Sequence, residues 1–314
     1  MNQVEISSNS DISGVPIGKN GDTLEPFLLD WNVHGPHLLI GGPSQSGRTS
    51  LLHTIALSSA WKYSPNDLWI VLMDGSNGSL RKLADLPHVI EWVYEEDGLA
   101  RNIACLQNEL EYRRQERAKD KNIALPQILF LVDDYDLTSE ALGLNDIILA
   151  KLGKNIRQDY DLGFHFLISA TPENLGGGND PLIKQMKLAR SGVSLSDVNT
   201  LELLGGRPSR AMGRQEFSQG RGYFVSRSSF ILVQFAIPDE NAYSSVCDRW
   251  ENATRAIWLR PASEEQIETV RSESAPAPKS DSNRTSSKIG STIDFEKSLA
   301  LYQEQQQRLA KKGQ

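Results

Sequence analysis

The sequence predicts an α/β fold with a mainly parallel, doubly wound sheet. Between residues 37 and 195, short apolar segments alternate with segments of helical periodicity, which is typical of parallel strands joined by crossover helices. Several of the apolar segments end in glycines or acidic residues, at the strand ends where open α/β sheets bind their ligands. An antiparallel hairpin is predicted on each side of this region, the first before residue 30 and the second after residue 221.

The N-terminal elements are bounded by turn residues. Asn20, Gly21 and Asp22 separate two short apolar runs and indicate a β-hairpin. Residues 68–74 form a continuous apolar run, as expected for a strand that is covered on both faces. The elements predicted up to residue 119 are strands at 15–18, 26–29, 37–41 and 68–74 and helices at 48–61 and 95–119. The long helix is acidic in its first turn and basic near its end, which suits the helix dipole.

The following elements continue the alternation and end in the second hairpin. They are predicted as strands at 127–132, 163–169 and 188–195, helices within 144–160 and at 197–204, and hairpin strands at 222–226 and 229–236. The carboxyl ends of the strands at 37–41 and 127–132 carry the glycine-rich loop and the acidic residues described below. Because these ends meet at one edge of a parallel sheet, we expect a single ligand site there.

Composition is that of a globular protein from a reducing compartment. With 314 residues the chain is long enough to bury a substantial core. Its net charge of −7 argues against a nucleic-acid-binding protein, and DNA is not expected as a partner. The two cysteines, Cys105 and Cys247, lack metal-ligand spacing. No signal peptide and no apolar stretch of membrane-spanning length is recognisable, so a cytoplasmic location is expected.

Changes in composition divide the chain into four predicted parts. These are residues 1–14 (disordered N-terminus), 15–260 (α/β domain), 261–291 (disordered linker rich in Ser, Ala, Pro, Lys and Glu) and 292–314 (amphipathic helix). The apolar side of the last part consists of Phe295, Leu299, Tyr302 and Leu309. This segment is predicted either as a frayed, solvated helix or as a short helix that docks on a partner.

A phosphate-binding loop is predicted between the strand at 37–41 and the helix that follows. Residues 42–49 read GPSQSGRT and fit the pattern G-x-x-x-x-G-K-[ST], except that Arg48 replaces lysine. In such a loop, backbone N–H groups surround a phosphate chain and the positive end of the helix adds to the anion site. The predicted nucleotide-binding residues are Gly42, Pro43, Ser44, Gln45, Ser46, Gly47, Arg48, Thr49 and Ser50. An ordinary glycine-rich strand–helix turn is the alternative.

A second predicted strand ends in two carboxylates, because Asp133 and Asp134 follow the apolar residues 127–132. In phosphate-loop proteins such a strand carries the aspartate that holds Mg²⁺, and the next acidic residue can orient the attacking water. We therefore predict Thr49 and Asp133 as metal residues, with ATP and Mg²⁺ as cofactors. Asp134 and Thr171, which follows the next strand, are the predicted catalytic residues. A strand followed by a solvated acidic turn is the alternative.

Ordered motifs over residues 15–238 resemble the ATPase domain of FtsK/SpoIIIE-type proteins. The motifs are VPIGK at 15–19, PHLLIGG at 36–42, Glu109 with Arg113 and Arg114 in the long helix, LVDDYD at 131–136, and LGFHFLI at 162–168 before Ala170 and Thr171. The DDYD quartet, LLGG at 203–206 and GRG at 220–222 are most similar to the C-terminal ATPase domains of EccC and EssC proteins, which drive type VII (ESX) secretion. The resemblance implies a RecA-like P-loop NTPase fold.

The resemblance also implies an assembly. Family members commonly carry such domains in tandem behind membrane segments and work as hexameric rings. With one such core, this chain is expected to be a fragment, a split subunit or a stand-alone relative. Its expected partners are other ATPase subunits of a membrane-bound secretion complex, in a homo- or hetero-hexamer, which would recruit it to the inner face of the membrane. Some related domains take up the signal segment of the exported substrate, and no residue here can be matched to that role.

Two departures from the family pattern bear on turnover. Arg48 places a planar, branched guanidinium where a compact ammonium fits between phosphate oxygens. Asp134 stands where active motors of the family place glutamate, so its carboxylate is one methylene short, and a misplacement of about 1 Å can lower a rate by ~10²-fold. The prediction is an ATP-binding domain with weak or no hydrolysis. Two alternatives remain open, an active hexameric translocase of DNA or protein and a protein-docking module that binds no nucleotide.

Overall fold

The computed structural model describes residues 13–75, 78–177, 180–196, 198–209, 217–227 and 229–274. Packing divides the chain into two units, Met1–Ala275 and Pro276–Gln314. The second unit lies outside the described residues, and with it the predicted helix at 292–314 and the predicted linker beyond residue 275. Residues 1–12 of the predicted disordered N-terminus also lie outside them. All elements named below belong to the first unit.

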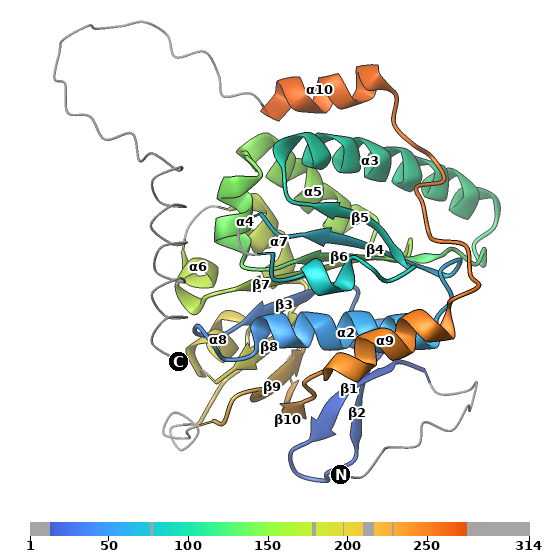
Figure 1. The fold of residues 1–314 in the computed structure, drawn as a ribbon. Coiled ribbons are helices and arrows are strands. Elements are labelled where there is room, and N and C mark those ends of the chain that lie inside the picture. Colours follow the sequence, from blue (N-terminus) through green and yellow to red (C-terminus); the bar gives the residue numbers. More distant parts are fainter. Residues whose placement is uncertain are drawn as a thin grey trace, which may run out of the picture. The chain divides into compact units, whose positions relative to one another are not determined.

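Ten strands of the described residues form one sheet in the order β2-β1-β10-β9-β8-β3-β7-β6-β4-β5 (Figure 1). The strands are β1 (Val15–Asn20), β2 (Pro26–Leu29), β3 (Leu38–Gly41), β4 (Leu68–Met73), β5 (Val89–Val93), β6 (Gln127–Val132), β7 (Phe164–Ala170), β8 (Ser191–Leu195), β9 (Arg221–Ser226) and β10 (Ser229–Phe235). From β8 to β5 all neighbours are parallel. The strands β9, β10, β1 and β2 extend the sheet in antiparallel fashion. The predicted fold class, including both hairpins, is confirmed.

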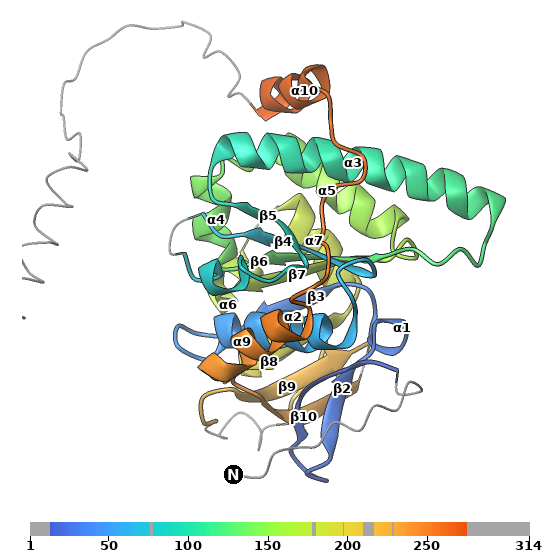
Figure 2. The same cartoon turned by 45° about the vertical axis from the view of Figure 1, so that its right-hand side comes forward.

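Helices cover both faces of this sheet (Figure 2). They are α1 (Trp31–His34), α2 (Arg48–Lys62), α3 (Glu96–Lys119), α4 (Tyr135–Ala141), α5 (Asp146–Gln158), α6 (Pro172–Gly176), α7 (Pro181–Leu188), α8 (Val198–Leu203), α9 (Glu240–Arg249) and α10 (Glu264–Ser274), with a 3-10 turn η1 (Arg81–Leu83). The helices α2 and α9 contribute to one core cluster, and α3, α5, α7 and α10 contribute to the other. In the part of the chain that the structure describes, no helix is long and apolar enough to cross a membrane.

The parallel strands are apolar throughout because each supplies both cores. In β4, Trp69 and Val71 belong to the cluster under α3, whereas Ile70 and Leu72 belong to the cluster under α2. All six residues of β4 are buried. Successive side chains of a strand point to opposite faces, so a strand covered on both sides needs no polar alternation. The strands β3, β7 and β6 pair in parallel, so their carboxyl ends lie side by side at one edge of the sheet.

The long helix α3 is joined to the amino-terminal ends of β6 and β7 by a buried arginine, Arg113. Arg113 is fully buried and donates from Nε to Glu109 at 2.7 Å. Its Nη1 donates to the carbonyl oxygens of Pro126 and Leu162, which precede β6 and β7. Arg260 completes the cluster with a 2.7 Å contact to Glu109. These residues therefore have a structural role and fix α3 over the sheet.

Residues 264–274 differ from the sequence prediction. They form helix α10 where a disordered linker from residue 261 is predicted, so that prediction is wrong for this segment. The reason is that Ile267 and Val270 are buried against the cluster under α3. Two apolar side chains at i and i+3 are enough to dock a helix when a neighbouring helix supplies the rest of the apolar surface.

Further elements are missing from the sequence prediction, namely the strand β5, the helices α1, α4, α6, α7 and α9 and the turn η1. Helix α7 ends at Leu188, where a strand is predicted to begin, and β8 starts at Ser191. The signal for α7 was present in the chain. Asp180 caps the helix by accepting hydrogen bonds from the N–H groups of Leu182 and Ile183, and Pro181 occupies its first turn, both of which are typical of a helix start.

Candidate nucleotide-binding site

The predicted phosphate loop joins β3 to α2 at the carboxyl edge of the parallel strands. Gly47 caps α2 with a φ of 105°, in the left-handed region that favours glycine. Gln45 also has a positive φ, of 64°. A side chain at Gly42 would place its Cβ 2.5 Å from the Ser46 Oγ and 2.7 Å from the Leu195 carbonyl oxygen. The loop is therefore tightly wound, and two of its glycines are required by its geometry.

The loop offers hydrogen-bond donors that the rest of the domain leaves unused. Among the described residues, no acceptor contacts the backbone N–H groups of Ser44, Gln45 and Gly47. The Ser46 side chain is buried, and its Oγ has no partner in the described part of the chain. Since buried polar groups in proteins are nearly always hydrogen-bonded, the buried Ser46 hydroxyl fits a loop that binds an anion, and the N–H groups beside it are free to donate to the same ligand. The positive end of α2 adds to the same site.

Asp133 lies at the centre of the site and accepts hydrogen bonds from three hydroxyl groups. Thr49 Oγ1 donates to its Oδ2 at 2.7 Å, and Ser79 Oγ donates to the same oxygen at 2.6 Å. Ser169 Oγ donates to Oδ1 at 2.5 Å. The structure thus brings Thr49 and Asp133 into direct contact, although 84 residues separate them. A hydroxyl and a carboxylate are ligands that Mg²⁺ prefers, so the donor set fits that ion.

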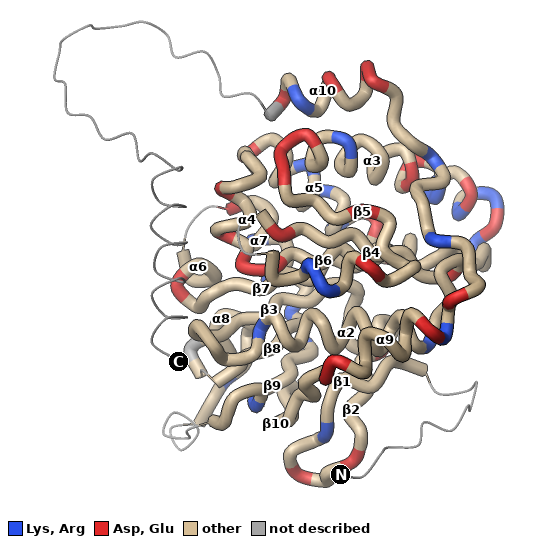
Figure 3. The backbone as a smooth tube through the Cα atoms, viewed as in Figure 1, with Lys and Arg blue, Asp and Glu red and all other residues tan. Residues whose placement is uncertain are grey.

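Asp134 follows at a bend between β6 and α4. Its φ is 47°, which lies in the left-handed region, and its N–H donates to Ser169 Oγ at 2.9 Å. Arg48 approaches from the first turn of α2, and its Nη2 lies 3.4 Å from Asp134 Oδ1. The other arm, Nη1, is buried without a hydrogen-bond partner in the part of the chain that the structure describes. Acidic residues also lie in the first turn of α4, which Asp134 precedes, and in the first turn of α3 (Figure 3).

The remaining predicted site residues make no hydrogen bond with the Asp133 carboxylate among the described residues. Thr171 follows β7 and precedes α6, but its side chain does not cap that helix. Pro43, Ser44 and Gln45 are exposed, as expected for the outer part of the loop. Ser50 lies one residue into the helix beyond Thr49, and its carbonyl oxygen accepts from Thr54. The structure therefore brings together Arg48, Thr49, Asp133 and Asp134, whereas no hydrogen bond joins the Thr171 side chain to them among the described residues.

Two residues of the cluster, Ser79 and Ser169, were missed by sequence reasoning. Ser169 is the next-to-last residue of the strand β7, and Ser79 follows the end of β4. A hydroxyl at the carboxyl end of a parallel strand beside the phosphate loop was the available signal. Serines are common at strand ends, so the signal is weak without a structure.

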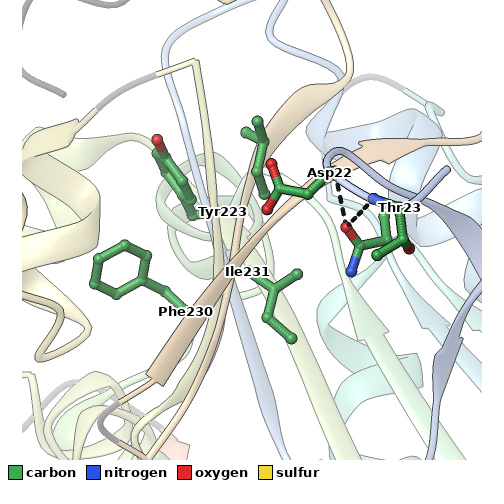
Figure 4. Close-up of a pocket in the computed structure, with 7 residues that line it drawn as sticks. Asp22, Thr23, Tyr223, Phe230 and Ile231 are labelled. Atoms are coloured by element: carbon green, nitrogen blue, oxygen red, sulfur yellow. Dashed lines mark hydrogen bonds between the residues drawn. The ribbon is translucent and has the colours of Figure 1, made fainter.

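A hollow on the antiparallel part of the sheet is separate from the phosphate loop and has a different lining. It lies between the β1–β2 turn and the strands β9 and β10 (Figure 4). Its lining residues are Asn20, Asp22, Thr23, Tyr223, Phe230, Ile231 and Leu232. The Asn20 side chain is used to hold the turn, because its Oδ1 accepts from the N–H groups of Asp22 and Thr23. Since none of the described residues that line it is cationic, this hollow does not suit a phosphate.

Curated relatives carry the same kind of domain. The ESX secretion system protein EccC of Thermomonospora curvata is 28% identical over 227 residues, which are 68% of this chain and 16% of that protein. The type VII secretion system protein EssC of Staphylococcus aureus is 26% identical over 159 residues, which are 46% of this chain and 11% of that protein. The chain thus spans less than a fifth of the length of these relatives.

Solved structures agree with the fold. EssC (ATPases 2 and 3) from Geobacillus thermodenitrificans superposes with a TM-score of 0.65 at 23% identity, over 73% of this chain and 42% of that one. EccC (ATPases 2 and 3) from Thermomonospora curvata, in complex with a signal sequence peptide, superposes with a TM-score of 0.61 at 26% identity, over 73% and 41% of the two chains.

The family model described as FtsK/SpoIIIE family matches residues 3–173. The match covers more than half of the chain and includes the phosphate loop, Asp133 and Thr171. The doubly wound sheet and the loop between β3 and α2 are those expected of a P-loop ATPase fold. By its sequence and its fold, the chain belongs to the FtsK/SpoIIIE family.

Proposed function

We propose that this chain is a nucleotide-binding domain of a type VII-like secretion ATPase assembly, and that it hydrolyses ATP slowly or not at all. The observation that carries the proposal is the 2.7 Å contact between Thr49 Oγ1 and Asp133 Oδ2. It joins the start of α2 to the end of β6 beside a loop with unused N–H donors. A bound nucleotide needs the phosphate loop and the start of α2 on one side, and its metal ion needs the carboxylate after β6 on the other.

Each part of the site has a task in this proposal. The N–H groups of Ser44, Gln45 and Gly47 and the N-terminus of α2 bind the phosphate chain. Thr49 and Asp133 hold Mg²⁺, and Ser169 orients Asp133 through its hydrogen bond to Oδ1. When bound, the ion neutralises charge on the phosphate oxygens. The tight packing around Gly42 keeps the loop in the shape that exposes its donors.

Slow turnover is supported by the contact between Arg48 and Asp134. The guanidinium arm that would otherwise reach phosphate lies 3.4 Å from the carboxylate that would orient the attacking water. The contact engages both the Arg48 guanidinium and the Asp134 carboxylate, which turnover would need at the phosphate and at the attacking water. The short carboxylate of Asp134 adds to this effect, because positioning and electrostatic stabilisation account for almost all catalysis of phosphoryl transfer.

The assembly role is proposed from the relatives. EccC and EssC are named as secretion system proteins, and one EccC structure holds a signal sequence peptide. The corresponding role for this chain is to occupy an ATPase position beside other ATPase subunits. Its partners would then be those subunits and, in the assembled complex, the signal segment of an exported protein.

Calorimetric titration of the full chain with ATP and ADP, with Mg²⁺ and with EDTA, tests the nucleotide-binding part. We expect measurable affinity that rises with Mg²⁺, and a loss of that rise by at least about tenfold in Thr49→Ala and Asp133→Asn. Thr23→Ala and Asp22→Asn are matched controls, since both residues are exposed in the β1–β2 turn. An absence of ATP and ADP affinity in the wild-type chain would remove the proposal.

A further inference from the structure

Ser79 contacts the carboxylate of the candidate site from a third direction. Its Oγ donates to Asp133 Oδ2 at 2.6 Å, and that oxygen also accepts from Thr49 at 2.7 Å. Ser79 belongs neither to the phosphate loop nor to the strand β6, but to the segment between β4 and η1. Two hydroxyls on one carboxylate oxygen fix the plane of the carboxylate more strictly than the Thr49 contact alone.

Ser79 and Leu80 are held by hydrogen bonds with two other residues, His53 and Asp74. Asp74 is buried, and its Oδ2 accepts from the N–H of Leu80 at 2.8 Å. His53 Nε2 lies 2.9 Å from the carbonyl oxygen of Ser79. A carbonyl oxygen can only accept, so His53 donates from Nε2. His53 follows Thr49 by four residues in α2, which places both side chains on the same face of that helix.

The second ring nitrogen of His53 connects this segment to α9. His53 Nδ1 lies 2.7 Å from the hydroxyl of Tyr243, and α9 lies along α2 (Figure 1). Burial lowers the pKa of His53, so the ring is neutral near pH 7, with the proton on Nε2 and with Nδ1 accepting from the tyrosine. Both ring nitrogens are thereby engaged, which fixes the tautomer and the orientation of the ring.

We propose that Ser79 is a positioning residue for Asp133, and that His53 and Tyr243 hold it in place. The packing of α9 on α2 would then set how strongly Mg²⁺ raises nucleotide affinity. The physical reason is that partners which orient a metal-ligating carboxylate typically change metal affinity by about 10–100-fold when they are removed. This inference rests on the nucleotide-binding function proposed above. It adds that the helix α9, through Tyr243, influences the metal affinity of the same site.

Nucleotide affinities of full-chain variants, with Mg²⁺ and with EDTA, test it. Ser79→Ala should reduce the Mg²⁺-dependent gain in ATP affinity about tenfold, and Tyr243→Phe should reduce it about threefold, while the affinity in EDTA stays unchanged. Ser58→Ala is the matched serine control, because Ser58 Oγ donates to the Pro16 carbonyl oxygen on the β1 side of α2. Tyr63→Phe is the tyrosine control, because Tyr63 is also partly buried against the cluster under α2.

A second readout follows the ring of His53 by ¹⁵N NMR. Addition of Mg²⁺ and ATP should shift the His53 ring signals in the wild-type chain, and Tyr243→Phe should abolish that shift. Equal losses of affinity with Mg²⁺ and with EDTA in Ser79→Ala, or His53 signals that do not respond to Mg²⁺ and ATP, would overturn the inference and leave the proposed function intact. A wild-type chain that binds no nucleotide would overturn both.

Discussion

Arg48 and Asp134 contact each other across the candidate site, with 3.4 Å between Nη2 and Oδ1. Each is a departure from the family pattern, an arginine for a lysine and an aspartate for a glutamate. A longer cation reaches a shorter carboxylate, so the two departures fit one another as a pair. Because the other arm of Arg48 is buried without a partner in the described part of the chain, the guanidinium still has a donor free for phosphate. This contact supports the proposal of a domain that binds nucleotide and turns it over slowly.

Reverting both residues should therefore raise turnover. The double variant Arg48→Lys/Asp134→Glu is expected to hydrolyse ATP about 10²-fold faster than the wild-type chain, since a misplacement of about 1 Å costs a similar factor. Each single variant should gain less, because it leaves one departure in place. Phosphate release at saturating Mg²⁺ and ATP is the measurement. Arg101→Lys is the control, as Arg101 forms an exposed ion pair with Glu91 away from the loop. A double variant that binds ATP without faster turnover would show that other parts limit the rate.

Filling the space at Gly42 should weaken nucleotide binding. A methyl group there would lie 2.5 Å from Ser46 Oγ and 2.7 Å from the Leu195 carbonyl oxygen, so the loop must shift and its N–H groups must turn. Gly42→Ala is expected to weaken ATP binding at least about tenfold and to cost about 1–3 kcal/mol of stability, as overpacking does. Gly98→Ala is the control, because its Cβ would meet nothing nearer than 3.6 Å. Equal ATP affinities for the two variants would argue against a loop of this shape.

Removing Arg113 should destabilise the whole domain. It is fully buried, and its loss leaves Glu109 Oε1 and two carbonyl oxygens without their donor, while Arg260 still contacts Glu109 Oε2. Breaking a buried ion pair in this way costs about 3–5 kcal/mol, so Arg113→Ala should lower the urea midpoint strongly. Lys119→Ala should leave the midpoint unchanged, since its ion pair with Glu116 is exposed. A small effect of Arg113→Ala would mean that Arg260 alone supports Glu109.

The sequence was informative where the signal is local. The strand–loop–helix around Gly42 and the strand ending at Asp133 could be predicted, because glycine spacing and apolar runs are read within a few residues. The contacts of His53 with Tyr243 and Ser79 could not be predicted from the sequence. His53 and Tyr243 are 190 residues apart, and these residue types have no distinctive spacing. Helix α10 was missed for a similar reason. Its two buried apolar residues, Ile267 and Val270, become a signal only beside the surface of α3.

Acid should destabilise the domain through three buried histidines. Burial lowers the pKa of His88 and His165 to about 4 and that of His37 to about 3, whereas unfolded histidine titrates near 6.5. Below that pH the unfolded chain binds more protons, so this contribution to stability is complete above pH 6.5 and is lost as the pH falls toward 4. Each histidine should cost about 1.4 kcal/mol per pH unit in this window. Urea unfolding between pH 7.5 and 5 measures the slope, and His88→Gln should reduce it by about one proton. An unchanged slope in His88→Gln would mean that His88 is already protonated in the folded domain.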